Sequence, residues 1–245
     1  MSTGLKLVEE LARDTARLGV ETGLPYIAAS ADIGSPEAIV GVDGRPVAET
    51  IFRWLDPDLQ YWRDRGFALR SPFVYATRFS AEPFYYRHGR FGTWRPAAWV
   101  DTFGRVEAAD AFGIGAAIIA PAYLPRGVIG AIVWASPDPE VPVETIFAAR
   151  ASEFHAAALK LAGACQDLRR PAPAEAARLT RREIQCLKWA AAGKTDMEIG
   201  TIVRISTPTV RFHITNAAGK LGVGGRSQAV LRAANLGYIG AAAAG

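Results

Sequence analysis

The chain has 245 residues, of which 50% are hydrophobic and 21% charged, and its formal net charge is +4. This balance excludes a wholly disordered chain, and the lack of an apolar run of about 18 residues argues against a membrane-spanning helix. Two cysteines cannot supply a disulfide framework or a four-cysteine zinc site, and the acidic N-terminus is untypical of a secretion signal, so we expect a cytoplasmic protein.

The first half of the chain combines a helical pattern with several strand-like ones. Residues 5–19 have apolar side chains at helical spacing, and residues 25–29 and 38–42 are expected strands. Residues 113–124 and 127–136 are two apolar, β-prone runs that meet at a Pro-Arg-Gly turn signal, which indicates paired antiparallel strands. These patterns predict an α+β domain in which helices flank an antiparallel sheet.

Aromatic residues concentrate in one part of this domain, because 13 of the 24 in the chain lie between Phe52 and Trp94. Apolar walls with a few polar tips suit a buried small-molecule site. An ordinary aromatic-rich core has the same composition, so both interpretations stay open. The 13 residues are Phe52, Trp54, Tyr61, Trp62, Phe67, Phe73, Tyr75, Phe79, Phe84, Tyr85, Tyr86, Phe91 and Trp94.

Residues 144–168 form the longest predicted helix, because their apolar residues recur at spacings of three and four along one stripe. This stripe packs either on its own domain or, in part, against a partner subunit. The sequence PAPAEAAR at 171–178 then ends the helix and forms a connector. We therefore expect one domain at 1–170, a linker at 171–178 and a second domain at 179–245. The stripe consists of Phe147, Ala151, Phe154, Ala158, Leu161, Cys165 and Leu168.

Charge differs between the two parts of the chain. From Pro171 to the end there are ten basic and four acidic residues, whereas the first 170 residues hold 18 basic and 20 acidic ones. A near-neutral body with a basic C-terminal domain favours a polyanionic partner such as nucleic acid for that domain. A solvated basic face without a partner is the alternative.

Residues 179–240 are predicted to form four short helices with distinct capping residues. Two Thr-x-x-Glu capping boxes begin at Thr180 and Thr195, Ser206 caps a third helix, and a fourth is expected at 227–236. This order is typical of a helix-turn-helix unit. The expected buried residues are Met197, Ile199 and Ile202 in the second helix, and Val210, Ile214, Ala217 and Leu221 in the third.

The third of these helices has a polar face that suits DNA. Thr207, Arg211 and Thr215 are four residues apart and therefore align. An arginine there can form two hydrogen bonds to a guanine edge, while flanking basic side chains suit phosphates. The candidate DNA-binding residues are Lys194, Arg204, Thr207, Thr209, Arg211, Thr215 and Lys220.

The sequences LTRREIQCLKWAAAGKTDMEIG and ISTPTVRFHITNAAGKLGV resemble the DNA-binding domain of the LuxR family of transcription regulators. This resemblance implies a four-helix domain that dimerises and places its third helix in the major groove of double-stranded DNA, with Arg211 and Thr215 at base-reading positions. The matching positions are Leu179, Thr180, Arg182, Glu183, Leu187, Gly193, Lys194, Glu198, Ile199, Thr209, Val210, His213, Lys220 and Leu221.

The N-terminal domain has neither the acidic cluster nor the strand-end aspartate of a phosphorylatable receiver. Its length and residues 111–136 resemble instead the autoinducer-binding domain of quorum-sensing regulators. The resemblance implies a small-molecule site on a helix-flanked sheet. The corresponding candidate ligand-binding residues are Asp58, Tyr61, Trp62, Ser71, Tyr75, Tyr86, Ala117 and Val133.

Several of these positions depart from the pattern that binds acyl-homoserine lactones. Ser71 stands where the family has an aspartate that accepts the amide N–H of the ligand, and Asp58 stands where a tryptophan donates to the lactone carbonyl. Trp62 replaces the tyrosine that bonds the amide carbonyl, Tyr86 replaces a second tryptophan, and Ala117 replaces a usual glycine. Because serine is a weaker acceptor than a carboxylate, these departures predict a different signal.

The sequence thus predicts a homodimeric transcription regulator that senses a small hydrophobic or aromatic signal and controls promoter binding. The alternative is a ligand-independent regulator whose pocket is filled by its own aromatic side chains. An enzyme is disfavoured, because the histidines His88, His155 and His213 are scattered and no nucleophile elbow, phosphate loop or HExxH motif is present. His213 is interpreted as a partly buried packing residue, and no cofactor or metal is expected.

Overall fold

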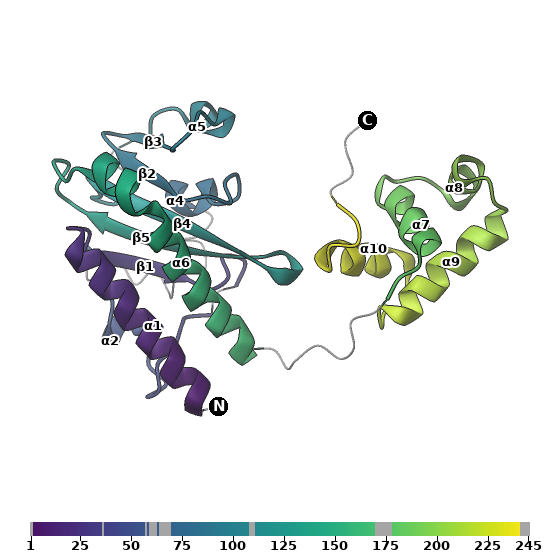
Figure 1. Ribbon diagram of the computed structural model, residues 1–245, viewed down its shortest axis with the longest axis horizontal. Coiled ribbons are helices and arrows are strands. Elements are labelled where there is room, and N and C mark those ends of the chain that lie inside the picture. Colours follow the sequence, from purple (N-terminus) through teal and green to yellow (C-terminus); the bar gives the residue numbers. More distant parts are fainter. Residues whose placement is uncertain are drawn as a thin grey trace. The chain divides into compact units, whose positions relative to one another are not determined.

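The chain folds into two compact units, an α+β unit followed by a helical unit, which confirms the predicted fold classes (Figure 1). The computed structural model describes residues 2–35, 37–56, 58, 63, 70–107, 111–169 and 178–240. Within these ranges no helix has the length and apolarity that crossing a membrane requires.

The α+β unit is built on a five-stranded antiparallel sheet with the order β1-β5-β4-β2-β3. The helices expected at 5–19 and 144–168, the strand at 25–29 and the strand pair near 113–136 are all present. In chain order, residues 2–169 form α1 (Ser2–Glu21), β1 (Tyr26–Ser30), α2 (Val47–Thr50), α4 (Pro72–Ala76), β2 (Phe84–Arg87), β3 (Arg90–Gly92), α5 (Ala98–Phe103), β4 (Ala116–Leu124), the 3-10 turn η1 (Pro125–Gly127), β5 (Val128–Ser136) and α6 (Val143–Arg169).

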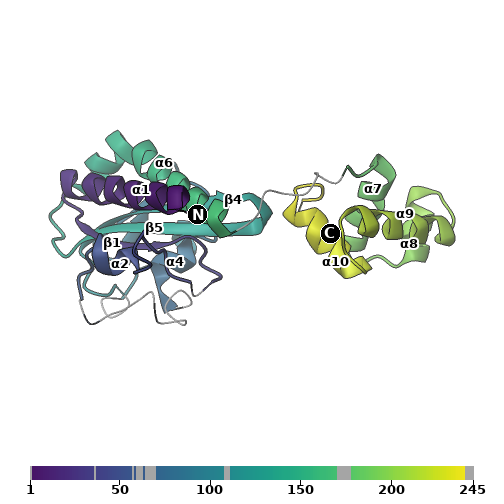
Figure 2. The same ribbon diagram turned by 90° about the horizontal axis from the view of Figure 1, so that it is seen from below.

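Helices cover both sides of the sheet. α1 and α6 lie side by side over one side, whereas α2 and α4 lie on the other (Figure 2). β4 and β5 are almost entirely buried, so they are continuously apolar rather than alternating. Successive side chains still point to opposite sides. Even-numbered residues such as Ile118 and Trp134 join the core under α1 and α6, and odd-numbered ones such as Ile119 and Val133 join the core on the other side.

The core under α1 and α6 is called the helical face, and Trp134 is its largest fully buried side chain. The Trp134 side chain is fully buried, its ring centroid lies 4.9 Å from that of Phe154 on α6, and its Nε1 donates to the backbone oxygen of Thr15 on α1 at 2.9 Å. The predicted stripe on α6 packs here, with Phe154 and Leu161 fully buried. Most of the stripe thus packs on its own domain, whereas Leu168 has an exposed fraction of 38%, and packing of part of the stripe against a partner subunit stays a prediction.

The prediction of a strand at 38–42 is wrong. These residues contribute only one isolated bridge, Val40 to Pro46, and belong to a turn closed by the Gly41 N–H and the Arg45 carbonyl at 2.9 Å. The apolar character that suggested a strand comes partly from Ile39, which is buried in the helical face. Glycines and a proline around these residues favour the turn over an extended strand.

The helical unit consists of α7 (Arg181–Ala191), α8 (Asp196–Val203), α9 (Thr207–Lys220) and α10 (Arg226–Asn235). Both capping boxes are present, at Thr180 and Thr195, and Ser206 caps α9 by accepting the Thr209 N–H. The four predicted helices are therefore confirmed. All four residues predicted on the inner side of α9 are buried.

Two of the three residues expected to be buried in α8 are exposed. Ile199 is fully buried, whereas the exposed fractions of Met197 and Ile202 are 69% and 42%. Ile199 and Val203 are four residues apart and define the inner stripe of this short helix, which leaves Met197 on the opposite side. The pattern in eight residues is too short to distinguish an inner from an outer apolar side chain.

Candidate DNA interface and ligand face

The outer side of α9 presents the predicted DNA-reading residues. Arg211 and Thr215 are exposed and Thr207 is half-buried at the first turn. Because they lie four residues apart, they follow one line along a helix whose diameter fits the major groove of DNA. Phe212, with an exposed fraction of 61%, lies next to this line. Phe212 was not among the residues predicted from the sequence, although an apolar residue between polar ones on this face could have indicated it.

The N-terminus of α9 is shaped by its cap. Ser206 Oγ accepts the Thr209 N–H at 3.3 Å and lies 2.7 Å from Thr209 Oγ1. Thr209 therefore belongs to the capping group rather than to the reading line. Arg204, exposed just before α9, has φ +59°, a left-handed conformation that is uncommon for a residue with a side chain. It ends α8 and gives the sharp turn between the two helices.

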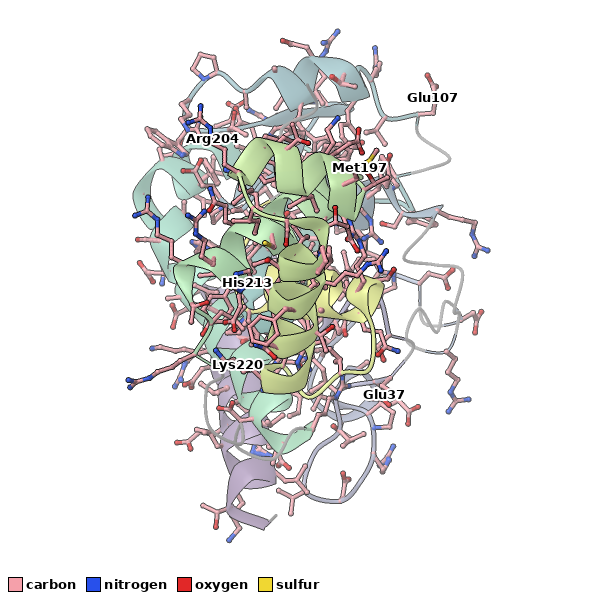
Figure 3. The ribbon with its side chains drawn as sticks, turned by 90° about the vertical axis from the view of Figure 1, so that its right-hand side faces the viewer. Glu37, Glu107, Met197, Arg204, His213 and Lys220 are labelled. Atoms are coloured by element: carbon pink, nitrogen blue, oxygen red, sulfur yellow. The ribbon has the colours of Figure 1, made fainter. Side chains whose placement is uncertain are left out.

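The three flanking cations have different surroundings. Lys194 is half-buried before α8 with its Nζ 3.9 Å from Glu198, and Arg204 is exposed at the opposite end of that helix. Lys220 is at the C-terminus of α9, about 20 Å along the helix from Thr207. Figure 3 shows Arg204, His213 and Lys220 in sequence along the unit. His213 is half-buried, as predicted, and its ring centroid lies 5.8 Å from that of the exposed Phe212.

Lys220 forms an ion pair within the unit. Its Nζ donates to both carboxylate oxygens of Glu183, at 2.8 and 2.9 Å. Burial raises the pKa of Glu183, but the hydrogen bonds from Lys220 and from the Thr180 N–H lower that pKa more, so the carboxylate is charged. The structure therefore gives Lys220 a role in joining α9 to α7, which the sequence reading did not foresee.

The core on the side of the sheet opposite α1 and α6, called the aromatic face, contains three of the predicted ligand residues. Tyr86 lies directly opposite Ala117 in the β2–β4 pairing, and Val133 is nearby on β5. All three are buried. Burial raises the pKa of Tyr86, so its hydroxyl is neutral and can both donate and accept.

Much of the aromatic face is filled by rings that meet edge to face. The centroid of Phe73 lies 5.0 Å from that of Tyr86 and 5.8 Å from that of Phe91, and Phe84 lies 5.0 Å from Trp99. Such geometry is favourable for aromatic pairs. The β2–β3 hairpin that carries Tyr86 and Phe91 was not predicted, although His88 and Gly89, with φ of +50° and +78°, form the kind of turn that favours a hairpin.

The remaining ligand candidates are placed differently. Ser71 is buried, but its hydroxyl caps α4 by accepting the Val74 N–H at 3.4 Å. Tyr75 is half exposed and packs against Phe79 at 5.3 Å between ring centroids. Asp58 is exposed. Tyr61 and Trp62 lie outside the described residues.

The three histidines lie on different elements of the described chain. His88 lies in the β2–β3 turn, His155 on α6 and His213 on α9. Burial lowers the pKa of His155, as expected for a half-buried histidine. In the described ranges no three His, Cys, Asp or Glu residues gather as metal ligands would. The outer side of α9 and the aromatic face are the candidate binding surfaces.

Comparison with known proteins agrees with this geometry. The family model "Bacterial regulatory proteins, luxR family" matches residues 177–233, and "Autoinducer binding domain" matches residues 7–164. The putative HTH-type transcriptional regulator y4qH of Sinorhizobium fredii is 32% identical over 73% of this chain and 54% of its own length. The transcriptional activator protein PhzR of Pseudomonas fluorescens is 30% identical over 74% of this chain and 71% of its own length.

A solved structure, "SdiA in complex with octanoyl-rac-glycerol", is 20% identical over 94% of this chain and 88% of its own, with a TM-score of 0.47. The matched stretches span only 25%, 54% and 30% of the first three curated relatives.

A sheet domain followed by a helix-turn-helix domain defines the class of two-domain transcription regulators. The chain belongs to the luxR family of bacterial regulatory proteins and carries an autoinducer binding domain. Both are families of transcription regulators and not of enzymes.

Proposed function

We propose that this chain binds a roughly palindromic operator as a homodimer, through two copies of α9, in the cytoplasm. The observation that carries the proposal is the line of Thr207, Arg211 and Thr215 on the outer side of a capped helix-turn-helix. A two-fold dimer matches a two-fold operator. Relatives named as transcription activators or regulators support promoter control as the outcome.

The DNA test compares two single variants of the full chain. Arg211→Ala is expected to reduce discrimination between operator and random DNA by about 1–3 kcal/mol, because a bidentate base contact is lost. Lys194→Ala is expected to weaken binding to both kinds of DNA alike, because phosphate contacts carry no sequence information. Titrations at one fixed salt concentration measure both. An equal loss on both DNAs for Arg211→Ala would contradict its base-reading role.

For the N-terminal unit we propose a small hydrophobic signal that differs from an ordinary acyl-homoserine lactone. Tyr86, Ala117 and Val133 supply a largely apolar surface with one neutral hydroxyl. The Ser71 hydroxyl is already used as the cap of α4, and serine accepts less strongly than the carboxylate that family members have at this position. Both facts disfavour the usual amide headgroup.

The second candidate is a regulator that needs no ligand. The edge-to-face packing of Phe73, Tyr86 and Phe91 favours it. Aromatic rings that pack closely against one another form a complete core without a ligand. Native mass spectrometry of the protein purified from its own host, followed by denaturing extraction, separates the two candidates. A co-purified small molecule supports the sensor, and its headgroup tests the exclusion of lactones. An empty, folded chain that binds DNA supports the second candidate.

A further inference from the structure

The side chain of Arg211 is held by a residue outside α9. Arg211 Nε donates to Asp196 Oδ2 at 3.1 Å, and Asp196 lies in the first turn of α8. The exposed fraction of the Arg211 side chain is 72% and that of Asp196 is 23%. A guanidinium that uses its Nε–H in this way keeps both terminal nitrogens for a second planar partner.

The carboxylate of Asp196 is itself fixed from the other side. Its Oδ1 accepts from Arg226 Nη1, at the start of α10, and Arg226 Nη2 donates to the main-chain oxygen of Lys194. One aspartate therefore joins three helices, with one oxygen for each arginine. Because Arg226 is anchored to the main chain, the direction in which Asp196 holds Arg211 follows from the fold of the helix-turn-helix.

This arrangement bears on base recognition. A bidentate contact to guanine requires the arginine plane to be aligned with the base edge. A free arginine on a helix surface samples many rotamers and must lose that freedom on binding. It can also turn toward phosphates, and such contacts form equally well with DNA of any sequence. A carboxylate that accepts a hydrogen bond from the Nε–H limits both the rotamers that the arginine samples and its turning toward phosphates.

We propose that Asp196 is a specificity-determining residue that acts by positioning Arg211, without touching a base itself. The inference rests on the proposed base-reading role of Arg211. Removal of the carboxylate releases the guanidinium, so discrimination at the base pair read by Arg211 falls. Overall affinity for DNA does not fall with it, since one negative charge near the phosphates is lost.

The test uses the full-length chain and four variants. Binding sites are first selected from random DNA with the wild-type protein. Binding to the selected site and to every single base-pair substitution is then measured for Asp196→Asn, Arg211→Ala and the double variant. Glu198→Gln is the matched control, because it removes one charge from the same helix and glutamine can keep the capping box with Thr195.

Asp196→Asn is expected to lower discrimination about three- to tenfold at one base pair per half-site, the pair at which Arg211→Ala also acts. Random-DNA affinity stays equal or rises, as with Glu198→Gln. In the Arg211→Ala background the Asp196→Asn change has no further effect at that pair, because the group it positions is absent. A general loss of folding would instead lower binding at all positions.

The outcomes distinguish a failure of this inference from a failure of the proposed DNA-binding function on which it rests. No enriched site with the wild-type protein would overturn the proposed function and this inference together. An enriched site whose profile relaxes with Arg211→Ala but is the same for Asp196→Asn and Glu198→Gln would overturn the inference alone.

If Asp196→Asn melts below the assay temperature, Arg226→Lys replaces it. Lysine has no planar fork with which to bond both the Asp196 carboxylate and the Lys194 oxygen. Partial loss of discrimination at the same base pair is therefore expected. An unchanged profile would again refute the inference.

Discussion

Glu183 shows how one buried charge joins the start of the helical unit to the end of α9. With an exposed fraction of 3%, its carboxylate accepts from Lys220 and, at 2.7 Å, from the Thr180 N–H. Its pKa lies below the ordinary range because these donors outweigh the effect of burial. A lowered pKa in the folded state stabilises the fold above the unfolded pKa of about 4.3, and this contribution disappears as the pH falls through the folded pKa.

Glu183→Gln is therefore expected to lower the free energy of unfolding by about 1–3 kcal/mol at pH 7, because Lys220 and Thr180 lose a charged acceptor. The difference from wild type should shrink as the pH falls below about 4. Denaturant titrations across this pH range measure it. Asp14→Asn, at an exposed surface pair with Arg17, should have little effect at any pH. A difference for Glu183→Gln that is the same at pH 3 and pH 7 would refute the electrostatic explanation.

At this scale the sequence predicted the caps but not the ion pairs. Thr180 and Glu183 are three residues apart, so their relation is a local pattern. Lys220 and Glu183 are 37 residues apart, and Arg211 and Asp196 are 15 apart. Their pairing depends on how helices cross, which no spacing within one helix reports. For this reason Lys220 was expected to contact phosphates and its internal partner was missed.

The turn between α8 and α9 depends on Gly200, where the two helices approach closely. A β-carbon at Gly200 would lie 2.7 Å from the main-chain oxygen of Ile205, and that oxygen cannot rotate away as a side chain could. The Ile205 N–H also donates to the Gly200 oxygen at 2.9 Å. A larger residue must therefore shift the turn that sets the angle between α8 and α9.

Gly200→Ala is expected to destabilise the helical unit by about 1–3 kcal/mol through overpacking. The control is Gly219→Ala in α9, where the added carbon would have no neighbour within 4 Å, so that change should stabilise by about 0.5–1 kcal/mol. Denaturation midpoints measured by circular dichroism compare the two. If Gly200→Ala were also stabilising, helix propensity and not close approach would govern this position.

Among the elements, length decided what the sequence could predict. The long helices α1 and α6 and the nine-residue strands β4 and β5 give enough turns or alternations for a pattern to be recognised. β2 and β3 have four and three residues inside an aromatic run, so their pattern was hidden. The false strand at 38–42 was of similar length, and only its glycines and proline marked it as a turn.

At the scale of the whole molecule, each unit has core clusters of its own. The α+β unit has the helical and aromatic faces, and the helical unit has one cluster around Leu187 and another around Ile199. Separate cores are typical of domains that fold on their own. We propose that the two domains span residues 1–170 and 179–245, with a linker at 171–178.

Calorimetry is therefore expected to show two unfolding transitions. Phe154→Ala, on the helical face, should lower only one of them, and Leu187→Ala should lower only the other, because each removes a fully buried side chain at a cost of about 2–5 kcal/mol. A ligand of the α+β unit should raise only the transition that Phe154→Ala lowers. A single transition that both variants shift would show that the chain unfolds as one cooperative body.

The alternation along β4 and β5 constrains how this regulator can change its signal. Odd-numbered positions such as Ala117 and Val133 face the candidate ligand surface, while even-numbered ones such as Ile118 and Trp134 hold the helices. Substitutions at odd positions can alter the signal surface and leave the helix packing intact. Inserting or deleting one residue would exchange the two sets from that point on. Divergence in signal recognition is thus expected through substitutions within these strands, and through changes of length only in the loops that connect them.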